Sequence, residues 1–379
     1  MELRIPLSDL DYGKEEEEAV LTILHNRWLT MGAVTQEFEK EFANFVSAKH
    51  AIAVSNCTQA LHLACLALGI GQGDQVIVPA LTFVATANAV LYTGAKVQFA
   101  DVIGATDFNI SPSEIERQIT PDSKAIIVLH YGGYPCQMDK IVELAKRHNL
   151  AIIEDAAHAP GASLNGRALG TWGDVGCFSF FSNKNLATGE GGMLVTNRDD
   201  VAEAVKLLRS HGMTTLTWDR HKGHAHSYDV VALGYNYRID EIHSALGLAQ
   251  LHKLTKNNTR RSEITRRYLM GLNEAGFSEI EVPFSGTHGQ PSYHLFPILL
   301  PKKLNRQTFM DAMRSDGVQT SIHYPPAHKF TYYQKRYPDV TLPITEAIAA
   351  REVTLPLYPG MSDADVDYVL AAVQKNIKN

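Results

Sequence analysis

Short apolar runs alternate with amphipathic segments along the first half of the chain, and this alternation restricts the possible folds more than any other feature. Each apolar run has the length of a buried strand, and most of the intervening segments have a helical repeat. Strands that alternate with helices predict an α/β fold with a mostly parallel sheet covered by helices. The expected strands lie at residues 75–79, 96–100, 124–130, 151–154 and 175–181, and the expected helices at 15–26, 35–46, 56–68, 83–92 and 137–148.

The second half of the chain predicts a smaller α+β unit. A long helical pattern covers residues 240–272, and both an unbroken helix and one interrupted near Asn257-Asn258 are consistent with it. Strands are expected near residues 293–299 and 319–323.

A chain of 379 residues fits two domains. We place the large domain, with the N-terminal segment, at residues 1–250. The small C-terminal domain is expected at residues 251–379.

Charge and cysteine content disfavour several classes of protein. The net charge is −6 at pH 7 and the pI is near 6.2, whereas a nucleic-acid-binding protein needs a basic face. The four cysteines form no CxxC pair and no metal-finger spacing, which predicts reduced, packed thiols. Segment 1–20 lacks the apolar region of a signal peptide, and no apolar run is long enough to span a membrane. We therefore expect a cytoplasmic enzyme that binds neither nucleic acid nor membrane.

A lysine and an aspartate follow two of the expected strands. Asp155 follows the apolar run 151–154, and Lys184 lies just after the run 175–181. Ligands of α/β sheets bind beyond the carboxyl ends of the strands, so both side chains are expected at the same edge. A lysine that binds an aldehyde covalently and an aspartate that holds a pyridinium nitrogen are the minimal apparatus for pyridoxal phosphate (PLP) chemistry. Taken alone, Lys184 also fits a solvated surface lysine, and Asp155 a helix cap.

Neighbouring residues favour a cofactor site. The glycine-rich segment 189–192 permits close approach of the backbone, and Ser179 is placed to donate to a phosphate. Thr58 opens an expected helix whose free N–H groups suit a phosphate, with a plain N-cap as the alternative. Phe83 can stack on a pyridine ring or pack in the core. His158 can contact the same ring or simply pack.

Five motifs follow one another along the chain. They are Ser-Asn-x-Thr-x-Ala-Leu-His-Leu at 55–63, Val-Pro-Ala-Leu-Thr-Phe-Val-Ala-Thr-Ala-Asn-Ala-Val at 78–90, Glu-Asp-Ala-Ala-His at 154–158, Ser-Phe-x-x-x-Lys-x-x-x-x-Gly-Glu-Gly-Gly at 179–192, and Gly-Tyr-Asn-Tyr-Arg-Ile-Asp-Glu-Ile at 234–242. Together they resemble the DegT/DnrJ/EryC1/StrS sugar aminotransferases over nearly the whole chain. The resemblance implies the aspartate-aminotransferase-like fold type I of PLP-dependent transferases. In that fold a large domain with a mostly parallel mixed sheet carries a smaller C-terminal α+β domain.

The resemblance implies roles for the cofactor residues. Lys184 resembles the lysine that holds PLP, and Asp155 the partner of the pyridinium nitrogen. Phe83 and His158 resemble the two ring contacts. Asn236 resembles the asparagine that reaches the phosphate of the neighbouring subunit, which implies a homodimer with active sites shared across the interface. The implied phosphate contacts are Thr58, the amide of Gln59 and Ser179.

Two positions bear on how far the resemblance extends. Cys57 and Gln59 stand where the family often has Gly and Ala or Ser, so the detail of the phosphate loop stays open. Related dehydratases carry histidine at the position of Lys184, and the lysine therefore favours transamination.

The resemblance also implies a substrate site made from an N-terminal loop at 27–32 and a C-terminal loop at 319–326. Arg209 and Lys329 are further candidate cations for an anionic substrate. The implied substrate contacts are Trp28, Thr30, Met31, Gly32, Glu190, Arg238, His323 and Tyr324.

The resemblance predicts an enzyme that moves an amino group from L-glutamate to a nucleotide-linked keto sugar, with pyridoxamine phosphate formed on the way. The motifs look most like enzymes acting on C4 of dTDP-4-keto-6-deoxyglucose. A C3 aminotransferase for a dTDP-3-keto-6-deoxyhexose and GDP- or UDP-linked 4-keto sugars stay open. So do a dehydratase or other PLP transferase and a PLP-binding regulatory protein without turnover. A nicotinamide-dependent oxidoreductase is disfavoured because no GxGxxG follows an early strand.

Three histidines, His221, His224 and His226, gather near Trp218. No acidic or cysteine ligand lies at a familiar metal-binding distance in the sequence. We therefore expect a glycine-containing loop here rather than a metal site.

Overall fold

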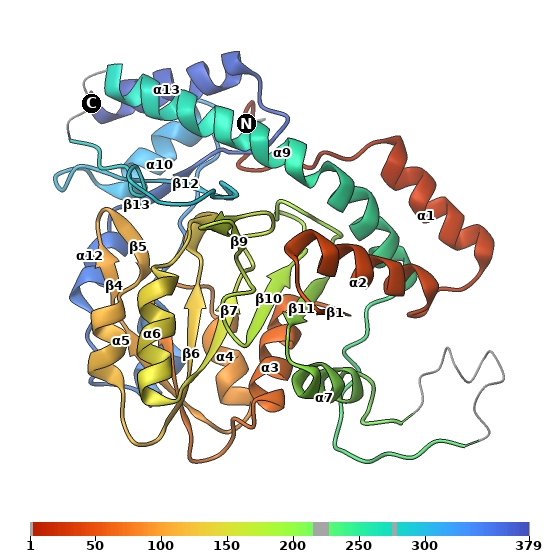
Figure 1. Ribbon diagram of the computed structural model, residues 1–379. Helices are drawn as coiled ribbons and strands as arrows, with labels where there is room; N and C mark the ends of the chain where they lie inside the picture. Colours follow the sequence, from red (N-terminus) through yellow and green to blue (C-terminus); the bar gives the residue numbers. More distant parts are fainter. Residues whose placement is uncertain (1–2, 215–226, 275–278, 379) are drawn as a thin grey trace.

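A seven-stranded sheet forms the centre of the computed structural model, which describes residues 3–214, 227–274 and 279–378 (Figure 1). The strand order is β1-β11-β10-β7-β6-β2-β3. β11 runs antiparallel to both of its neighbours, and β10, β7, β6, β2 and β3 pair in parallel. The strands are β1 (His50–Val54), β2 (Gln75–Pro79), β3 (Lys96–Ala100), β6 (Ser123–Leu129), β7 (Ala151–Asp155), β10 (Val175–Ser179) and β11 (Gly192–Thr196).

Helices cover both faces of this sheet, so its central strands are apolar on both sides. Ile126 and Ile152 belong to the core on one face, whereas the next residues in each strand, Ile127 and Ile153, belong to the core on the other. This alternation follows from the two-residue repeat of a strand. One face carries α2 (Ala33–Val46), α5 (Pro112–Gln118) and α6 (Met138–His148), and the other α3 (Cys57–Ala67), α4 (Ala85–Tyr92) and α7 (Asp199–Arg209).

A second core lies beside the sheet, in the upper part of Figure 1. Tyr268 and Leu272 of the long helix α9 contribute to it. Ile5 belongs to the same core and pairs with Val318, so the N-terminal segment packs in the C-terminal unit. Its elements are α9 (Glu241–Glu274), β12 (Phe296–Leu299), α10 (Arg306–Ser315), β13 (Glu352–Leu355) and α13 (Asp363–Lys378).

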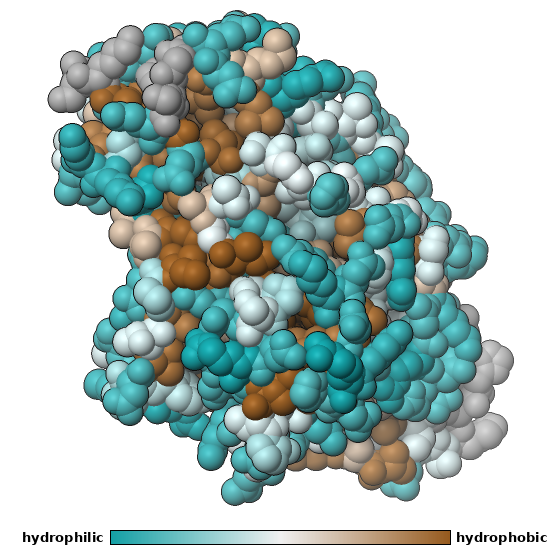
Figure 2. Space-filling model, turned by 60° about the vertical axis from the view of Figure 1, so that its left-hand side comes forward, coloured by the Kyte–Doolittle hydropathy of each residue, from teal (hydrophilic) through white to brown (hydrophobic). Residues whose placement is uncertain are grey.

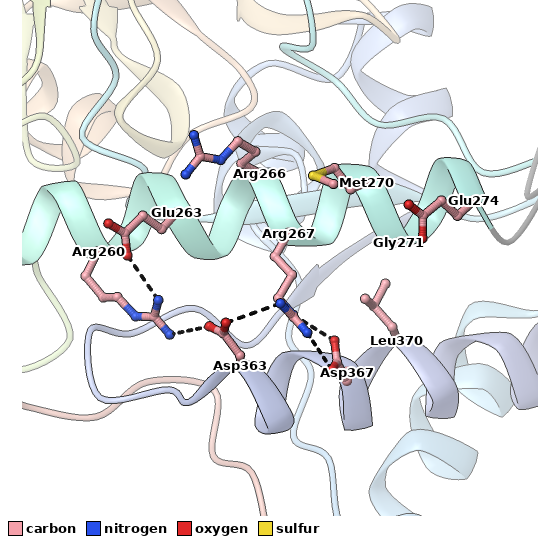
Figure 3. A pocket seen from close by; sticks show the side chains of 10 residues that line it. All are labelled: Arg260, Glu263, Arg266, Arg267, Met270, Gly271, Glu274, Asp363, Asp367 and Leu370. Atoms are coloured by element: carbon pink, nitrogen blue, oxygen red, sulfur yellow. Dashed lines mark hydrogen bonds and ion pairs between the residues drawn. The ribbon is translucent and has the colours of Figure 1, made fainter.

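Helices α9 and α13 face each other across a groove of about 370 Å³ (Figure 3). Asp363 accepts bonds from both Arg260 and Arg267, at 2.9 and 3.2 Å, and Arg267 also pairs with Asp367 at 2.6 Å. Arg266 points to the opposite side of α9 from Arg267 in the same view. These pairs are largely solvated, so they contribute little to the packing of the two helices.

A small apolar cluster joins the two parts of the molecule. Phe284 stacks on Tyr134 with ring centroids 4.2 Å apart, and Leu295 and Leu299 pack beside them. In Figure 2, apolar surface is visible at the waist between the upper and lower parts of this face, which is otherwise mostly hydrophilic.

The remaining elements are short, apart from one N-terminal helix. These elements are α1 (Lys14–Asn26), β4 (Val102–Gly104), β5 (Asp107–Ile110), η1 (Tyr131–Gly133), β8 (Ser163–Leu164), β9 (Arg167–Ala168), η2 (Ala327–Lys329), α11 (Thr331–Arg336) and α12 (Pro343–Ala349). No helix in the described ranges is long and apolar enough to cross a membrane.

The structure decides between two forms of the long helix that the sequence left open, and it corrects one expected strand. Helix α9 runs unbroken for 34 residues, and Asn258 within it donates to the Pro160 carbonyl at 2.9 Å. The expected strand at 319–323 does not form: only Ser321 pairs, with Thr354. The boundary proposed between residues 250 and 251 falls inside α9 and stays a prediction.

Candidate active site

A cavity of about 400 Å³ opens where the carboxyl ends of the parallel strands meet the start of α3. This is the edge at which α/β sheets bind ligands. Nine of the sequence-predicted site residues line it together: Thr58, Phe83, Asp155, His158, Ser179, Lys184, Glu190, His323 and Tyr324.

Lys184 lies on the turn that follows β10 and is partly exposed to the cavity. Its backbone N–H donates to the Phe181 carbonyl at 2.9 Å. The next residue, Asn185, is buried and donates to the Ser292 carbonyl at 2.7 Å and to Asn258 Oδ1 at 2.9 Å. Burial lowers the pKa of Lys184 to about 8, with Asp155 opposing part of the shift. The amine is therefore a better nucleophile near neutral pH than an ordinary lysine.

Asp155 ends β7 and is 4% exposed. Its Oδ2 accepts from the Thr86 hydroxyl at 2.7 Å, and its Oδ1 from the Ala157 N–H at 3.2 Å. Burial raises the pKa of Asp155, and these two bonds and the nearby Lys184 amine oppose part of that rise. A cationic group in the cavity would stabilise the ionised form of this buried carboxylate.

The N-terminus of α3 forms one end of the cavity. Asn56 caps this helix by accepting from the Gln59 N–H at 3.0 Å, so the Gln59 amide expected to contact a phosphate is already bonded. A Cβ on Gly192 would lie 2.6 Å from the Asn56 carbonyl carbon, which explains the need for glycine. Thr58 and Ser179 line the cavity beside this helix end. Their hydroxyls and the positive end of the helix dipole suit a phosphate.

Aromatic and imidazole rings also line the cavity. Phe83 is 59% exposed, and its ring centroid lies 6.1 Å from that of Tyr324. His158 Nδ1 accepts from the Gly132 N–H at 3.2 Å. Burial, Lys184 and His323 hold the pKa of His158 well below its usual range. The neutral ring therefore carries its proton on Nε2, which donates to Tyr324 Oη at 2.8 Å.

These residues fit PLP. The cavity combines a nucleophilic amine, a buried carboxylate, an exposed aromatic ring and a helix N-terminus with two hydroxyls. The four features suit the aldehyde, the ring nitrogen, the ring face and the phosphate of the cofactor. No group of metal-ligating side chains is present in the described part of the chain.

Sequence reasoning missed four buried residues around the cavity. Thr86 bonds Asp155, and Tyr131, Glu352 and Thr354 bond His323. Thr86 belongs to the motif at 78–90 but has no assigned role there, and no motif contains Tyr131, Glu352 or Thr354. Each contact joins residues that are between 29 and 192 positions apart.

The N-terminal loop expected at the substrate site lies outside the cavity lining. The Gly32 N–H donates to Glu241 Oε1 at 2.8 Å, which fixes the start of α2, and Thr30 pairs with Asp240. Met31 is buried. With Trp28, these residues are absent from the cavity wall of the isolated chain.

The other candidate residues lie away from the cavity wall or outside the described residues. Asn236 is exposed and pairs with Ser210 away from the cavity, and Arg238 pairs with Val54. Arg209 is buried against Glu39 at 2.6 Å, so it is not placed to meet a substrate. Lys329 pairs with Glu346 at 2.8 Å. His221, His224 and His226 lie outside the described residues.

Comparison with known proteins gives consistent matches. A sequence profile of the DegT/DnrJ/EryC1/StrS aminotransferase family matches residues 10–374. The spore coat polysaccharide biosynthesis protein SpsC of Bacillus subtilis is 41% identical over 376 residues, which cover 97% of this chain and 95% of SpsC.

Solved structures of aminotransferases share the fold over their full length. PseC of Helicobacter pylori, an aminotransferase involved in the biosynthesis of pseudoaminic acid, superposes with a TM-score of 0.92 at 28% identity and covers 100% of both chains. The PLP form of Spr1654, a putative sugar aminotransferase of Streptococcus pneumoniae, gives a TM-score of 0.91 at 28% identity and covers 99% of this chain and 98% of the other.

Proposed function

The chain belongs to the DegT/DnrJ/EryC1/StrS aminotransferase family and is a PLP-dependent sugar aminotransferase, and we propose that it transfers the amino group of L-glutamate to C4 of dTDP-4-keto-6-deoxyglucose. The observation that carries the proposal is the presence of Lys184 and Asp155 on one cavity with a helix N-terminus. The description of SpsC names spore coat polysaccharide biosynthesis, and that of PseC names the biosynthesis of pseudoaminic acid, which supports a biosynthetic pathway for a sugar.

The cavity residues divide the work of holding the cofactor. Lys184 would bind PLP covalently, and Asp155 would hold the proton of its ring nitrogen. Phe83 would cover the ring, and Thr58 and Ser179 would hold the phosphate. Bound PLP supplies an electron sink that weakens a C–H bond of the amino donor.

The protein's own groups then move protons. The Lys184 amine, with a pKa of about 8, would accept the proton from the α-carbon of L-glutamate and deliver it to the cofactor. Water supplies the carbonyl oxygen of the 2-oxoglutarate that leaves, while the amino group stays with the cofactor. The same proton transfer in reverse would deliver this amine to the keto carbon of the sugar, whose oxygen leaves as water. His323, Tyr324 and Glu190 border the space that remains for the sugar.

We also propose a cytoplasmic homodimer. Asn236, which is exposed and away from its own cavity, would contact the phosphate bound in the other subunit. Arg238, Trp28, Thr30, Met31 and Gly32 would complete the substrate site beside it.

An absorption titration tests the proposed function. The purified protein with PLP should show the visible band of lysine-bound cofactor, and L-glutamate should replace it with the near-ultraviolet band of pyridoxamine phosphate. Lys184→Ala should lack the visible band, whereas Lys329→Ala, which changes a lysine paired with Glu346, should keep it. Absence of the band in the wild type would refute the proposal.

The acceptor follows from the second half-reaction. Protein in the pyridoxamine form should regain its visible band when dTDP-4-keto-6-deoxyglucose is added. NMR of the product should place the new amine on C4. Restoration only by a 3-keto sugar, or by GDP- or UDP-linked sugars, would assign the substrate to those alternatives instead.

A further inference from the structure

His323 is held by buried partners at three of its four polar groups. Its N–H donates to Glu352 Oε2 at 2.8 Å, and its carbonyl accepts from the Tyr131 hydroxyl. Its Nδ1 lies 2.8 Å from Thr354 Oγ1. The remaining group is Nε2, on a ring that is 8% exposed and lines the cavity. The position of His323 is therefore fixed, and Nε2 is the group available to a ligand.

The contact at Nδ1 continues into a chain of three side chains. Thr354 Oγ1 also lies 2.6 Å from Glu352 Oε1. Glu352 and Thr354 are two residues apart on β13, so their side chains are on the same face. Both are 1% exposed. Ser321 exchanges two backbone bonds with Thr354 and fixes the distance between β13 and the segment that carries His323.

A hydroxyl has only one proton to donate, so the chain has two possible arrangements. If Thr354 donates to Glu352, then Nδ1 must carry the proton of the imidazole and Nε2 is an acceptor. If Thr354 donates to Nδ1, then Glu352 must be protonated and donate to Thr354, and Nε2–H is a donor.

The surroundings of Glu352 select the second arrangement at neutral pH. Glu352 forms no ion pair within the described ranges, and a buried unpaired carboxylate tends to take up a proton. Burial raises its pKa to about 8, opposed in part by Thr354, the His323 N–H and Arg306.

The other titratable groups around Glu352 leave this choice unchanged. Tyr131 and Tyr324 face it with pKa values raised by burial, so both stay neutral. Burial and the Lys184 amine lower the pKa of His323 to about 3, so its ring is neutral as well.

We propose that Glu352 and Thr354 are positioning residues that decide whether His323 offers the substrate a hydrogen-bond donor or an acceptor. While Glu352 is protonated, Nε2–H donates to a carbonyl or hydroxyl oxygen of the acceptor sugar. When Glu352 ionises, its proton passes to Thr354, the Thr354 proton passes to Nδ1, and one proton leaves Nε2 for the cavity. The identity of the ligand rests on the proposed function, whereas the proton arrangement does not.

The proton arrangement can be read directly by NMR. In the PLP-loaded protein labelled with ¹⁵N-histidine, long-range ¹H–¹⁵N correlations distinguish Nε2–H from Nδ1–H. His323→Gln identifies the signal among the 16 histidines. We expect Nε2–H at pH 7 and a change to Nδ1–H with a midpoint near pH 8.

Two near-isosteric variants provide the decisive comparison. The side chain introduced by Glu352→Gln can donate to Thr354 and accept from the His323 N–H at every pH, so the signal should stay Nε2–H up to pH 9. Thr354→Val removes the connecting hydroxyl and should abolish the change near pH 8, and Thr354→Ser should restore it. An Nδ1–H signal in the wild type at pH 7, or an unchanged midpoint in Glu352→Gln, would overturn the inference.

Kinetics separate this inference from the proposed function. The half-reaction with L-glutamate, followed by absorbance, should be unchanged in Glu352→Gln. For the sugar half-reaction, the ratio of kcat/KM of Glu352→Gln to that of the wild type should rise roughly tenfold from pH 7 to pH 9, because only the wild type loses the donor form above a pKa near 8. The titration of Lys184 affects both proteins alike and cancels in this ratio. Failure of the wild type to react with L-glutamate would count against the proposed function, while the NMR result would still decide the proton arrangement.

Discussion

At the scale of single residues, the cavity changes the chemistry of Lys184. Burial disfavours the charged amine more than the nearby Asp155 carboxylate favours it, so its pKa falls to about 8. The neutral amine is the form that attacks an aldehyde. At pH 7 roughly a tenth of such an amine is neutral, against about one part in 3,000 for a lysine with an ordinary pKa.

This shift predicts the pH dependence of cofactor capture. The second-order rate of PLP binding to the cofactor-free protein should rise about tenfold between pH 7 and pH 9 and level off, because the neutral fraction of Lys184 saturates above pH 8. Stopped-flow absorbance measures this rate. A rate that still rises tenfold per unit at pH 9.5 would indicate an unshifted lysine. Lys184→Ala supplies the background of surface reaction.

The sequence predicts part of the site at this scale and misses the rest for a physical reason. Asp155 and Lys184 follow apolar runs that become β7 and β10, so their shared edge could be expected. Thr86 and Glu352 have no such signal, because their roles depend on contacts between distant segments. The capping of the Gln59 amide by Asn56, in contrast, is a contact that an asparagine at the start of an expected helix favours.

At the scale of elements, α9 packs on α2 through a glycine. A Cβ on Gly247 would lie 2.5 Å from the Phe38 ring. That ring is fully buried and also packs against Phe42 and Phe180, with centroids 6.2 and 5.4 Å away. The ring therefore has little freedom to move, and the close approach of the two helices requires glycine at this position.

Gly247→Ala should destabilise the protein despite the better helix propensity of alanine. Overpacking costs about 1–3 kcal/mol and the propensity gain returns about 1, so we expect a net loss of about 1 kcal/mol in chemical denaturation. Gly104→Ala is the matched control, because its Cβ would have no neighbour within 4 Å. Equal stability of the two variants would contradict this account.

The apolar pattern of the sequence predicts an element correctly where tertiary packing favours the same element. β2 and β3 have the bounds expected from their apolar runs. The interruption considered near Asn257-Asn258 does not occur, because Asn257 is buried and Asn258 bonds Pro160. Tertiary contacts thus keep two poor helix formers inside α9. The segment 319–323 has a strand-like composition, but only Ser321 finds a strand partner.

At the scale of the whole molecule, some predicted site residues lie outside the cavity of their own chain. Asn236 is exposed, and Thr30 and Gly32 lie beside α2 and the start of α9. A two-fold dimer that brings these residues to the partner's cavity would account for their placement. The proposed homodimer is therefore testable by function as well as by mass.

Mixing two inactive variants tests the shared sites. Lys184→Ala lacks the cofactor amine, and Asn236→Asp would set a carboxylate against the phosphate of the other subunit. A mixed dimer contains one site with both defects and one with neither, so random exchange should restore about a quarter of wild-type activity. Mixing Lys184→Ala with Lys184→Arg should restore none. No recovery in the first mixture would place Asn236 in its own chain's site.

The pairing of Ile5 with Val318 has a consequence for how the protein is made. The ribosome releases Ile5 early and Val318 about 310 residues later, an interval of roughly 15–60 s at 5–20 residues per second. During that interval Ile5 lacks its strand partner, although the central sheet can already form. The second core therefore closes only near the end of translation, and a stalled or truncated chain would leave its N-terminal segment undocked and open to proteolysis.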